Sequence, residues 1–149
     1  MKIYKEQQSK LEDTEIYIKY AKMTQQIHQI ENVLQSMNHM IEAKCNGVTM
    51  KLSPADIFYI ESIDKRTYIY GENEVYDCTQ KLYQLEEFLH TAGFVRVRKN
   101  CIINQYKLTS IKIAQNSHIE ATLNNGECVL VTRKYISEIK EAFSTKKST

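Results

Sequence analysis

The spacing of apolar residues changes its period along the chain. Residues 15–20 alternate between apolar and polar positions, which is typical of a strand, and residues 3–4 belong to a shorter run of the same kind. From residue 23 to residue 41, apolar side chains recur every three or four positions, which predicts an amphipathic helix that Thr24 can cap. Residues 1–45 are therefore expected to form a short β-β-α extension.

The apolar seam of this predicted helix has two possible partners. Its members are Met23, Ile27, Ile30, Leu34, Met37 and Ile41. The run is too short to make a self-sufficient coiled coil, which favours packing within the monomer. Dimerisation through residues 1–41, or the binding of an unknown protein partner there, stays open as the alternative.

Beyond Asn46-Gly47 the pattern is that of a β domain, in which short apolar runs are separated by turn residues. The predicted strands cover residues 48–52, 56–63, 68–70, 75–76, 101–103, 108–114, 119–123 and 128–131. Asn124-Asn125-Gly126 predicts a tight hairpin turn, because Asn and Gly adopt positive φ at little cost. Helices are expected at residues 82–89, ending near Gly93, and from about Arg133. Residues 46–145 are predicted to form one mainly β domain with small helices.

Composition excludes several classes of protein. No apolar run approaches the length of a membrane span and no signal peptide is visible, so the expected compartment is the cytoplasm, without membrane insertion. The four cysteines lack metal-ligand spacing and are expected to be reduced thiols in or near the core, with no metal or cofactor.

An enzyme finds little support in the sequence. It contains no Gly-rich phosphate loop, HExxH or GxSxG motif. Cys101 could be made more acidic by Arg98 and Lys99, but it begins an apolar strand and has no base beside it. The chain is therefore expected not to be an enzyme.

Charge is segregated in a chain whose formal net charge is only +2. Between Phe88 and Ile119 there is no Asp or Glu, whereas this window contains Arg96, Arg98, Lys99, Lys107 and Lys112. Nearby acids would pair with the cations and repel an anionic ligand, so this run is suited to hold phosphates. A solvated basic face is the alternative interpretation.

Three cationic sites stand out, at residues 65–67, 96–100 and 133–134. If Thr132 caps the last helix, Arg133 and Lys134 occupy its first turn, where the helix dipole disfavours positive charge. Cations placed there would serve a phosphate, or an Arg could reach a guanine edge. The alternative is that Arg133 pairs with a nearby acid such as Glu138.

Residues 48–143 resemble a LytTR-type DNA-binding domain. The motifs that carry the resemblance are residues 56–61, 64–67, 94–104, 108–111 and 131–135, in the family's order and spacing. With its extension the chain is similar to the short stand-alone LytTR-family regulators of bacteria. The resemblance implies an elongated β fold of about ten strands that inserts loops into successive major grooves, with two monomers on direct repeats.

The resemblance also implies which residues contact DNA. They are Lys65, Arg66 and Thr67 in the first loop, Arg98, Lys99 and Asn100 in the second, and Arg133, Lys134 and Tyr135 at the third contact. The second loop departs from the family pattern, in which a His often precedes the basic residue and a Ser often follows it. Arg66 and Arg133 are expected to read bases, and the Lys residues and Arg98 to contact mainly phosphates.

The sequence therefore predicts a transcriptional regulator that binds double-stranded DNA sequence-specifically as a homodimer. A protein-interaction module with a non-specific basic patch is the second hypothesis. An RNA-binding protein is the third, since Tyr59, Tyr68 and Tyr70 could stack on bases.

Overall fold

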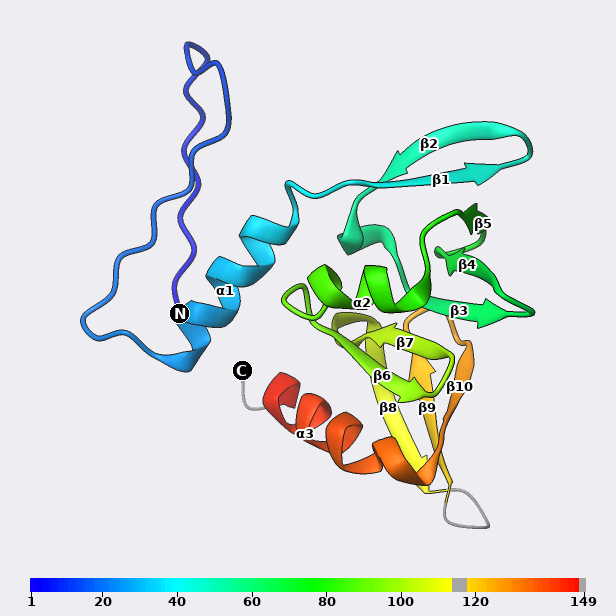
Figure 1. Cartoon of the computed structure of the whole chain (residues 1–149). Coiled ribbons are helices and arrows are strands. Elements are labelled where there is room, and N and C mark those ends of the chain that lie inside the picture. Colours follow the sequence, from blue (N-terminus) through cyan, green and yellow to red (C-terminus); the bar gives the residue numbers. More distant parts are fainter. Residues whose placement is uncertain (114–117, 148–149) are drawn as a thin grey trace.

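The computed structural model describes residues 1–113 and 118–147, and within them ten strands form two antiparallel sheets (Figure 1). The helices and strands are α1 Gln25–Ser36, β1 Ile41–Cys45, β2 Val48–Leu52, β3 Tyr59–Ile63, β4 Arg66–Tyr70, β5 Val75–Cys78, α2 Leu82–Leu89, β6 Phe94–Arg98, β7 Cys101–Asn104, β8 Leu108–Ile113, β9 Ile119–Leu123, β10 Cys128–Val131 and α3 Ile136–Lys147. Short 3-10 helices occur at η1 Pro54–Asp56, η2 Gln105–Lys107 and η4 Arg133–Tyr135. The mainly β fold with small helices is confirmed.

The larger sheet has the order β2-β1-β5-β4-β3-β7-β6, and the smaller sheet has the order β10-β9-β8. Most neighbouring strands are joined by short hairpin connections, so register follows from the turns. The predicted hairpin at Asn124-Asn125-Gly126 joins β9 to β10, with Val129 opposite Ala121. Ala114, which ends a predicted strand, lies outside the described residues.

Strand β1 differs from the prediction. The spacing of apolar residues predicts a helix that extends to Ile41, but α1 ends at Ser36 and Ile41 begins a strand. Ile41 and Ala43 are buried in the sheet while Glu42 and Lys44 are exposed, which is the alternation of a half-buried strand. The four-residue step from Met37 to Ile41 fits a helix by coincidence. The β1–β2 hairpin turns at Asn46 and Gly47, which both have positive φ.

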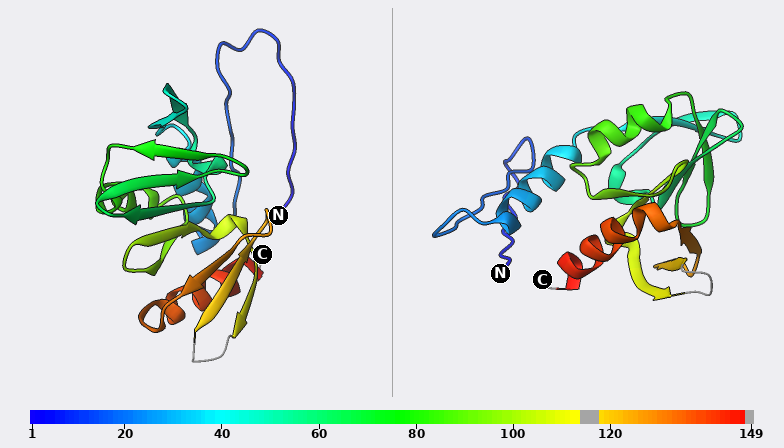
Figure 2. Two further views of the ribbon diagram at one scale, coloured as in Figure 1. Left: turned by 90° about the vertical axis from the view of Figure 1, so that its right-hand side faces the viewer. Right: turned by 60° about the horizontal axis from the view of Figure 1, so that its bottom comes forward.

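Residues 1–24 form no strand, so the two predicted strands of the extension are wrong for the isolated chain. A strand requires a neighbouring strand for its backbone hydrogen bonds, and in the part of the chain that the structure describes no strand pairs with this segment. Within the described chain, the one backbone hydrogen bond in residues 1–23 joins Leu11 N to Gln8 O. Figures 1 and 2 show the segment running away from the sheets and back to α1. Helix α1 is as predicted at its start, where the Thr24 hydroxyl accepts from Ile27 N.

Two hydrophobic clusters lie on opposite faces of the central strands. Helix α2 covers one cluster with Leu82, Leu85 and Leu89. Helix α3 contributes Ile139 to the other cluster, which also contains the inner face of the small sheet. In β7, Ile102 belongs to the first cluster whereas Cys101 and Ile103 belong to the second, because successive side chains point to opposite faces. Strand β7 is therefore buried on both faces, and β3 beside it is buried at Ile60 and half-buried at Tyr59 and Glu61.

The four cysteines are all free thiols, as expected, but not all of them are near the core. Cys101 is buried, and burial raises the pKa of its thiol to about 12, so the group stays protonated and unreactive near neutral pH. Cys128 is exposed, because it lies on the outward face of β10, and its predicted position near the core is wrong. No helix in the described ranges is both long enough and apolar enough to cross a membrane.

Candidate nucleic-acid interface

The first cationic site is the tight turn between β3 and β4. Ile63 pairs with Arg66, which leaves Asp64 and Lys65 as the two turn residues. Both have positive φ, at 49° and 66°, the combination that a two-residue hairpin turn requires. Asp tolerates this region well, but Lys at a position that favours Gly carries backbone strain. Gly would be the more stable residue at this position of the turn, but the chain has Lys65, whose side chain is exposed.

The two residues that follow this turn differ in access to solvent. Arg66 is exposed at the start of β4. Thr67 is only 3% exposed, so its side chain supports the sheet and offers no surface to a ligand. Lys81, which precedes α2, donates from Nζ to the carbonyl of Lys65 at 3.4 Å. A further exposed cation thus lies beside the turn, and it is not among the residues predicted from the sequence.

We expect Lys65→Gly to stabilise the fold while weakening DNA binding. Glycine relieves the strain of positive φ in the folded state. This gain exceeds the cost of the greater conformational entropy of glycine in the unfolded chain, so the free energy of unfolding should rise by about 0.5 to 1 kcal/mol. Loss of the ammonium group should lower affinity for duplex DNA and reduce the salt slope by about one contact. Urea unfolding and salt-dependent DNA titration measure the two effects.

Asn46→Gly is the matched control, because Asn46 has positive φ in the β1–β2 turn and carries no charge. It should leave DNA binding unchanged. If Lys65→Gly also left DNA binding unchanged, Lys65 would not belong to the interface.

The second site is the turn between β6 and β7, where Arg98 pairs with Cys101 across Lys99 and Asn100. Asn100 fixes this turn to β3: its carbonyl accepts from Ser62 N at 2.8 Å and its side-chain amide donates to Ser62 O at 3.0 Å. Arg96 supports the same turn by donating to the carbonyl of Lys99. Lys99 itself remains exposed. The second turn is thereby held beside the first one.

Arg98 and Arg96 are engaged within the protein. The Arg98 guanidinium lies 2.8 Å from the Glu61 carboxylate on β3 and donates to Leu130 O at 3.0 Å on β10. Arg96 Nε lies 2.7 Å from Glu86 of α2, and this hydrogen bond raises the pKa of the guanidinium. The run without acids in the sequence therefore meets acids from other elements in the fold. Arg98 has a side chain only 24% exposed and ties β6 to β3 and β10.

The third site is the η4 turn that leads into α3. Arg133 and Lys134 are exposed there, as predicted for the first turn of the last helical segment. The predicted cap is wrong, because the Thr132 hydroxyl donates to Val97 O and makes no bond to the helix backbone. Thr132 N donates to the same carbonyl at 2.9 Å, which fixes η4 to β6.

The side chains around η4 are arranged for access. No ion pair of Arg133 occurs within residues 1–113 and 118–147, so the alternative of a bridge to Glu138 is not observed. Tyr135 is half-buried against the core, and Lys134 Nζ lies 5.6 Å from the centroid of its ring. Tyr135 is therefore a support, while Arg133 and Lys134 reach outward.

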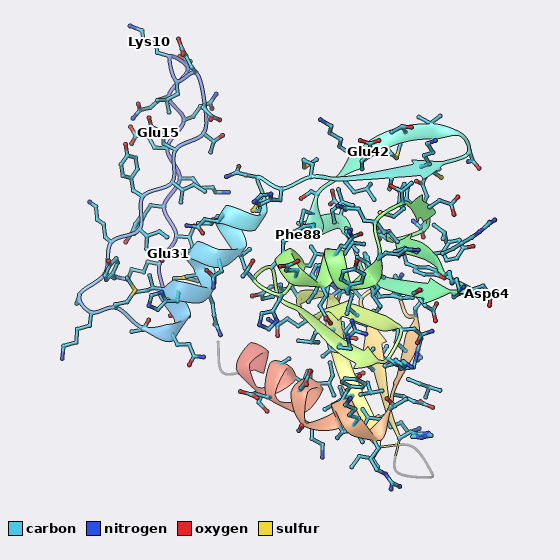
Figure 3. The ribbon with its side chains drawn as sticks, in the orientation of Figure 1. Lys10, Glu15, Glu31, Glu42, Asp64 and Phe88 are labelled. Atoms are coloured by element: carbon cyan, nitrogen blue, oxygen red, sulfur yellow. The ribbon has the colours of Figure 1, made fainter. Side chains whose placement is uncertain are left out.

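A chain of hydrogen bonds connects the three sites. Ser62 and Asn100 join the first two turns, and the carbonyl of Val97 joins β6 to Thr132 at the start of η4. In Figure 1 the β3–β4 turn, the β6–β7 turn and η4 follow one another down the right-hand side, and Figure 3 labels Asp64 at that margin. The exposed cations of this edge are Lys65, Arg66, Lys81, Lys99, Arg133 and Lys134. We call this set the cationic edge.

The nine candidate residues thus divide into two groups. Exposed cations belong to the cationic edge, whereas Thr67, Arg98 and Tyr135 are wholly or partly buried and Asn100 is exposed but bonded to β3. The sequence could not separate the groups, because the partners of Arg98 and Asn100 lie 37 and 38 positions away. Lys81 was missed for the same reason, since only folding brings it to Lys65.

Comparison with known proteins decides the family. A family described as the LytTr DNA-binding domain matches residues 47–144, well over half of the chain. The chain belongs to the LytTR family. Residues 47–144 of this LytTR protein accordingly form a DNA-binding domain of a family that is not a class of enzymes.

Two relatives give the extent of the likeness. The sensory transduction protein LytT of Enterococcus faecalis is 29% identical over 90 residues, which make up 60% of this chain and 37% of that protein. The LytTR chain thus spans little more than a third of that relative. An uncharacterized HTH-type transcriptional regulator of Staphylococcus aureus is 24% identical over 136 residues, covering 89% of this chain and 92% of the relative.

A solved structure supports the fold. The LytTr DNA-binding domain of a putative methyl-accepting/DNA response regulator from Bacillus cereus superimposes with a TM-score of 0.64 at 23% identity, covering 69% of this chain and 94% of that domain. Although the Staphylococcus relative is named HTH-type, the α-helices described here are separated by strands, so no two consecutive helices form a helix-turn-helix.

Proposed function

We propose that this LytTR protein is a sequence-specific transcriptional regulator that acts in the cytoplasm and reads successive major grooves of duplex DNA through the cationic edge, as a homodimer on direct repeats. The observation that carries the proposal is the hydrogen-bonded connection of three cationic turns through β3 and β6, the two strands that flank the fully buried β7. Side chains at rigid turns keep a fixed spacing and still reach base edges and phosphates.

The residues of the cationic edge take different roles in this proposal. Arg66 and Arg133 read base edges, because a guanidinium fork can bond guanine with two donors. The Lys residues neutralise phosphates as point charges, which positions the protein without reading sequence. Arg98 and Asn100 act as positioning residues, since their polar groups are engaged with β3 and β10.

Arg133→Ala is expected to lose about 1 to 3 kcal/mol of discrimination at one base pair, while Lys99→Ala weakens all sequences alike and flattens the salt slope. The measurement is a titration, at two salt concentrations, of a duplex selected from a random pool against an unselected duplex. Lys51→Ala on the edge strand β2 is the control for loss of an exposed cation away from the cationic edge. Equal loss on selected and unselected DNA would contradict base reading by Arg133.

A second function is favoured by one observation, the exposed apolar side chains of residues 1–24. They fit a protein-interaction module in which the basic patch only steers anionic surfaces. The same titration separates the two functions, because equal affinity of the wild-type protein for selected and unselected duplexes would support the module and contradict the regulator.

A further inference from the structure

The segment ahead of α1 has the composition of a strand but no strand beside it. Ile16 is 61% exposed, Tyr17 80% and Tyr20 52%, although their side chains favour burial in a sheet. Figure 3 shows the chain rising to Lys10 and returning past Glu15 toward α1, well apart from the edge strands β2 and β6. An extended run with open backbone donors and acceptors is a template for another strand.

The limb at residues 1–10 runs alongside the returning limb in Figures 1 and 2, yet no backbone hydrogen bond joins the two limbs within this described segment. The side chains that interact locally leave the backbone open. Tyr17 donates its hydroxyl to Glu15 at 2.7 Å, and both residues share one face of an extended chain. This contact is compatible with pairing along either backbone edge.

Residues 14–20 of the returning limb can pair with the same residues of a second copy running in the opposite direction. If residues 14–20 pair antiparallel with the same residues of a second copy, and the two-fold axis passes through Tyr17, Glu15 of each copy faces Lys19 of the other. In the same register Ile16 faces Ile18 and Thr14 faces Tyr20. Opposite charges meet at two symmetric positions and apolar side chains meet on the opposite face.

From this complementarity we propose that residues 14–20 form an antiparallel two-stranded contact between two copies of the chain, centred on Tyr17. The strand that pairs with this segment belongs to a second copy of the chain. Pairing with a different protein would not require residues 14–20 to be complementary to themselves. The inference rests on the homodimer of the proposed function and assigns its interface. A sheet of two strands alone is only marginally stable. In this arrangement residues 1–10 of each copy can add one outer strand on each side.

The test exploits the charge pair. Glu15→Lys and Lys19→Glu each create two like-charged pairs in the dimer and are expected to raise its dissociation constant about ten- to a hundredfold. A one-to-one mixture of the two variants restores both opposite pairs and should form heterodimers. The double variant Glu15→Lys/Lys19→Glu carries both changes in one chain. Two copies of it again place opposite charges at both positions, so it should dimerise like the wild type. Sedimentation equilibrium of the full chain without DNA measures each case.

Oxidative cross-linking checks the register. In a Cys128→Ser background, which removes the exposed native thiol, Tyr17→Cys should form a disulfide with its own copy, because residue 17 faces itself across the axis. Thr14→Cys is the matched control and should not form one, since it faces residue 20. Equal cross-linking of both variants would overturn the register.

The remaining outcomes separate this inference from the proposed function. A monomeric wild type, or a dimer insensitive to both charge reversals, overturns the interface. Binding of an unselected duplex is measured in parallel, because residues 14–20 lie outside the cationic edge. Variants that are monomeric but keep this binding support the interface, whereas a dimeric wild type that binds no duplex overturns the proposed function and leaves the interface standing.

Discussion

Gly93→Ala is expected to lower the free energy of unfolding by about 2 to 4 kcal/mol. Gly93 has a φ of 91°, where a side chain carries strain, and a Cβ built on it meets the ring of Tyr106. The neighbouring backbone cannot move away easily, because the carbonyl of Gly93 accepts from Gln105 N at 3.0 Å. Urea unfolding followed by circular dichroism measures the loss.

Gly126→Ala provides the comparison for this effect. Gly126 has a φ of 87°, but a Cβ added there meets no atom within 4 Å. Only the backbone strain remains, so the expected loss is about 1 kcal/mol. If the two variants lost the same stability, the steric contact with Tyr106 would contribute nothing and strain alone would explain both.

The largest effect is expected from Asn104→Asp, which should lower the free energy of unfolding by about 3 to 5 kcal/mol at neutral pH. Asn104 is 3% exposed, and its amide donates to Ile57 O at 2.9 Å while its carbonyl accepts from Tyr106 N at 3.0 Å. The substitution keeps the shape but directs a buried carboxylate at the carbonyls of Ile57 and Pro54. A buried charge without a partner is strongly destabilising.

The pH dependence of this variant identifies the cause. Burial raises the pKa of the new carboxyl group above its value in the unfolded chain, so the folded form retains a proton that the unfolded form has lost. The deficit relative to the wild type should therefore grow as pH rises from about 4 to 7 and shrink on acidification. Asn124→Asp makes the same change at an exposed turn and should alter stability by less than about 0.5 kcal/mol. A deficit that did not vary with pH would contradict a buried charge.

Local patterns predicted much of the fold, because they depend on neighbours in the sequence. The alternation in β9 and β10 and the Asn-Gly turn chemistry were sufficient for that hairpin. Strand β1 was missed because the step from Met37 to Ile41 fits two periods, and only pairing with β2 decides between them. The expected strands of residues 1–24 failed for the opposite reason, since local strand character cannot supply a neighbour.

The candidate interface shows the same division. The positions of the cationic turns followed from sequence, but the availability of each side chain did not. Arg66 and Arg98 look alike in a sequence, yet Arg66 is exposed and Arg98 is paired with Glu61. The acid that neutralises Arg98 comes from a strand far away in the chain. The lack of acids between residues 88 and 119 therefore could not show which cations of that run are unpaired in the fold.

The hydrogen bonds between Asn100 and Ser62 have a consequence for the choice of binding sites. These hydrogen bonds couple the β6–β7 turn to β3 beside the β3–β4 turn. If both turns contact a duplex as we propose, neither can shift along it without the other. A target whose contacted bases are spaced differently must adjust its own twist or bend to fit, and flexible steps between those bases would ease this adjustment. The protein would then select for the mechanics of base pairs that it never touches.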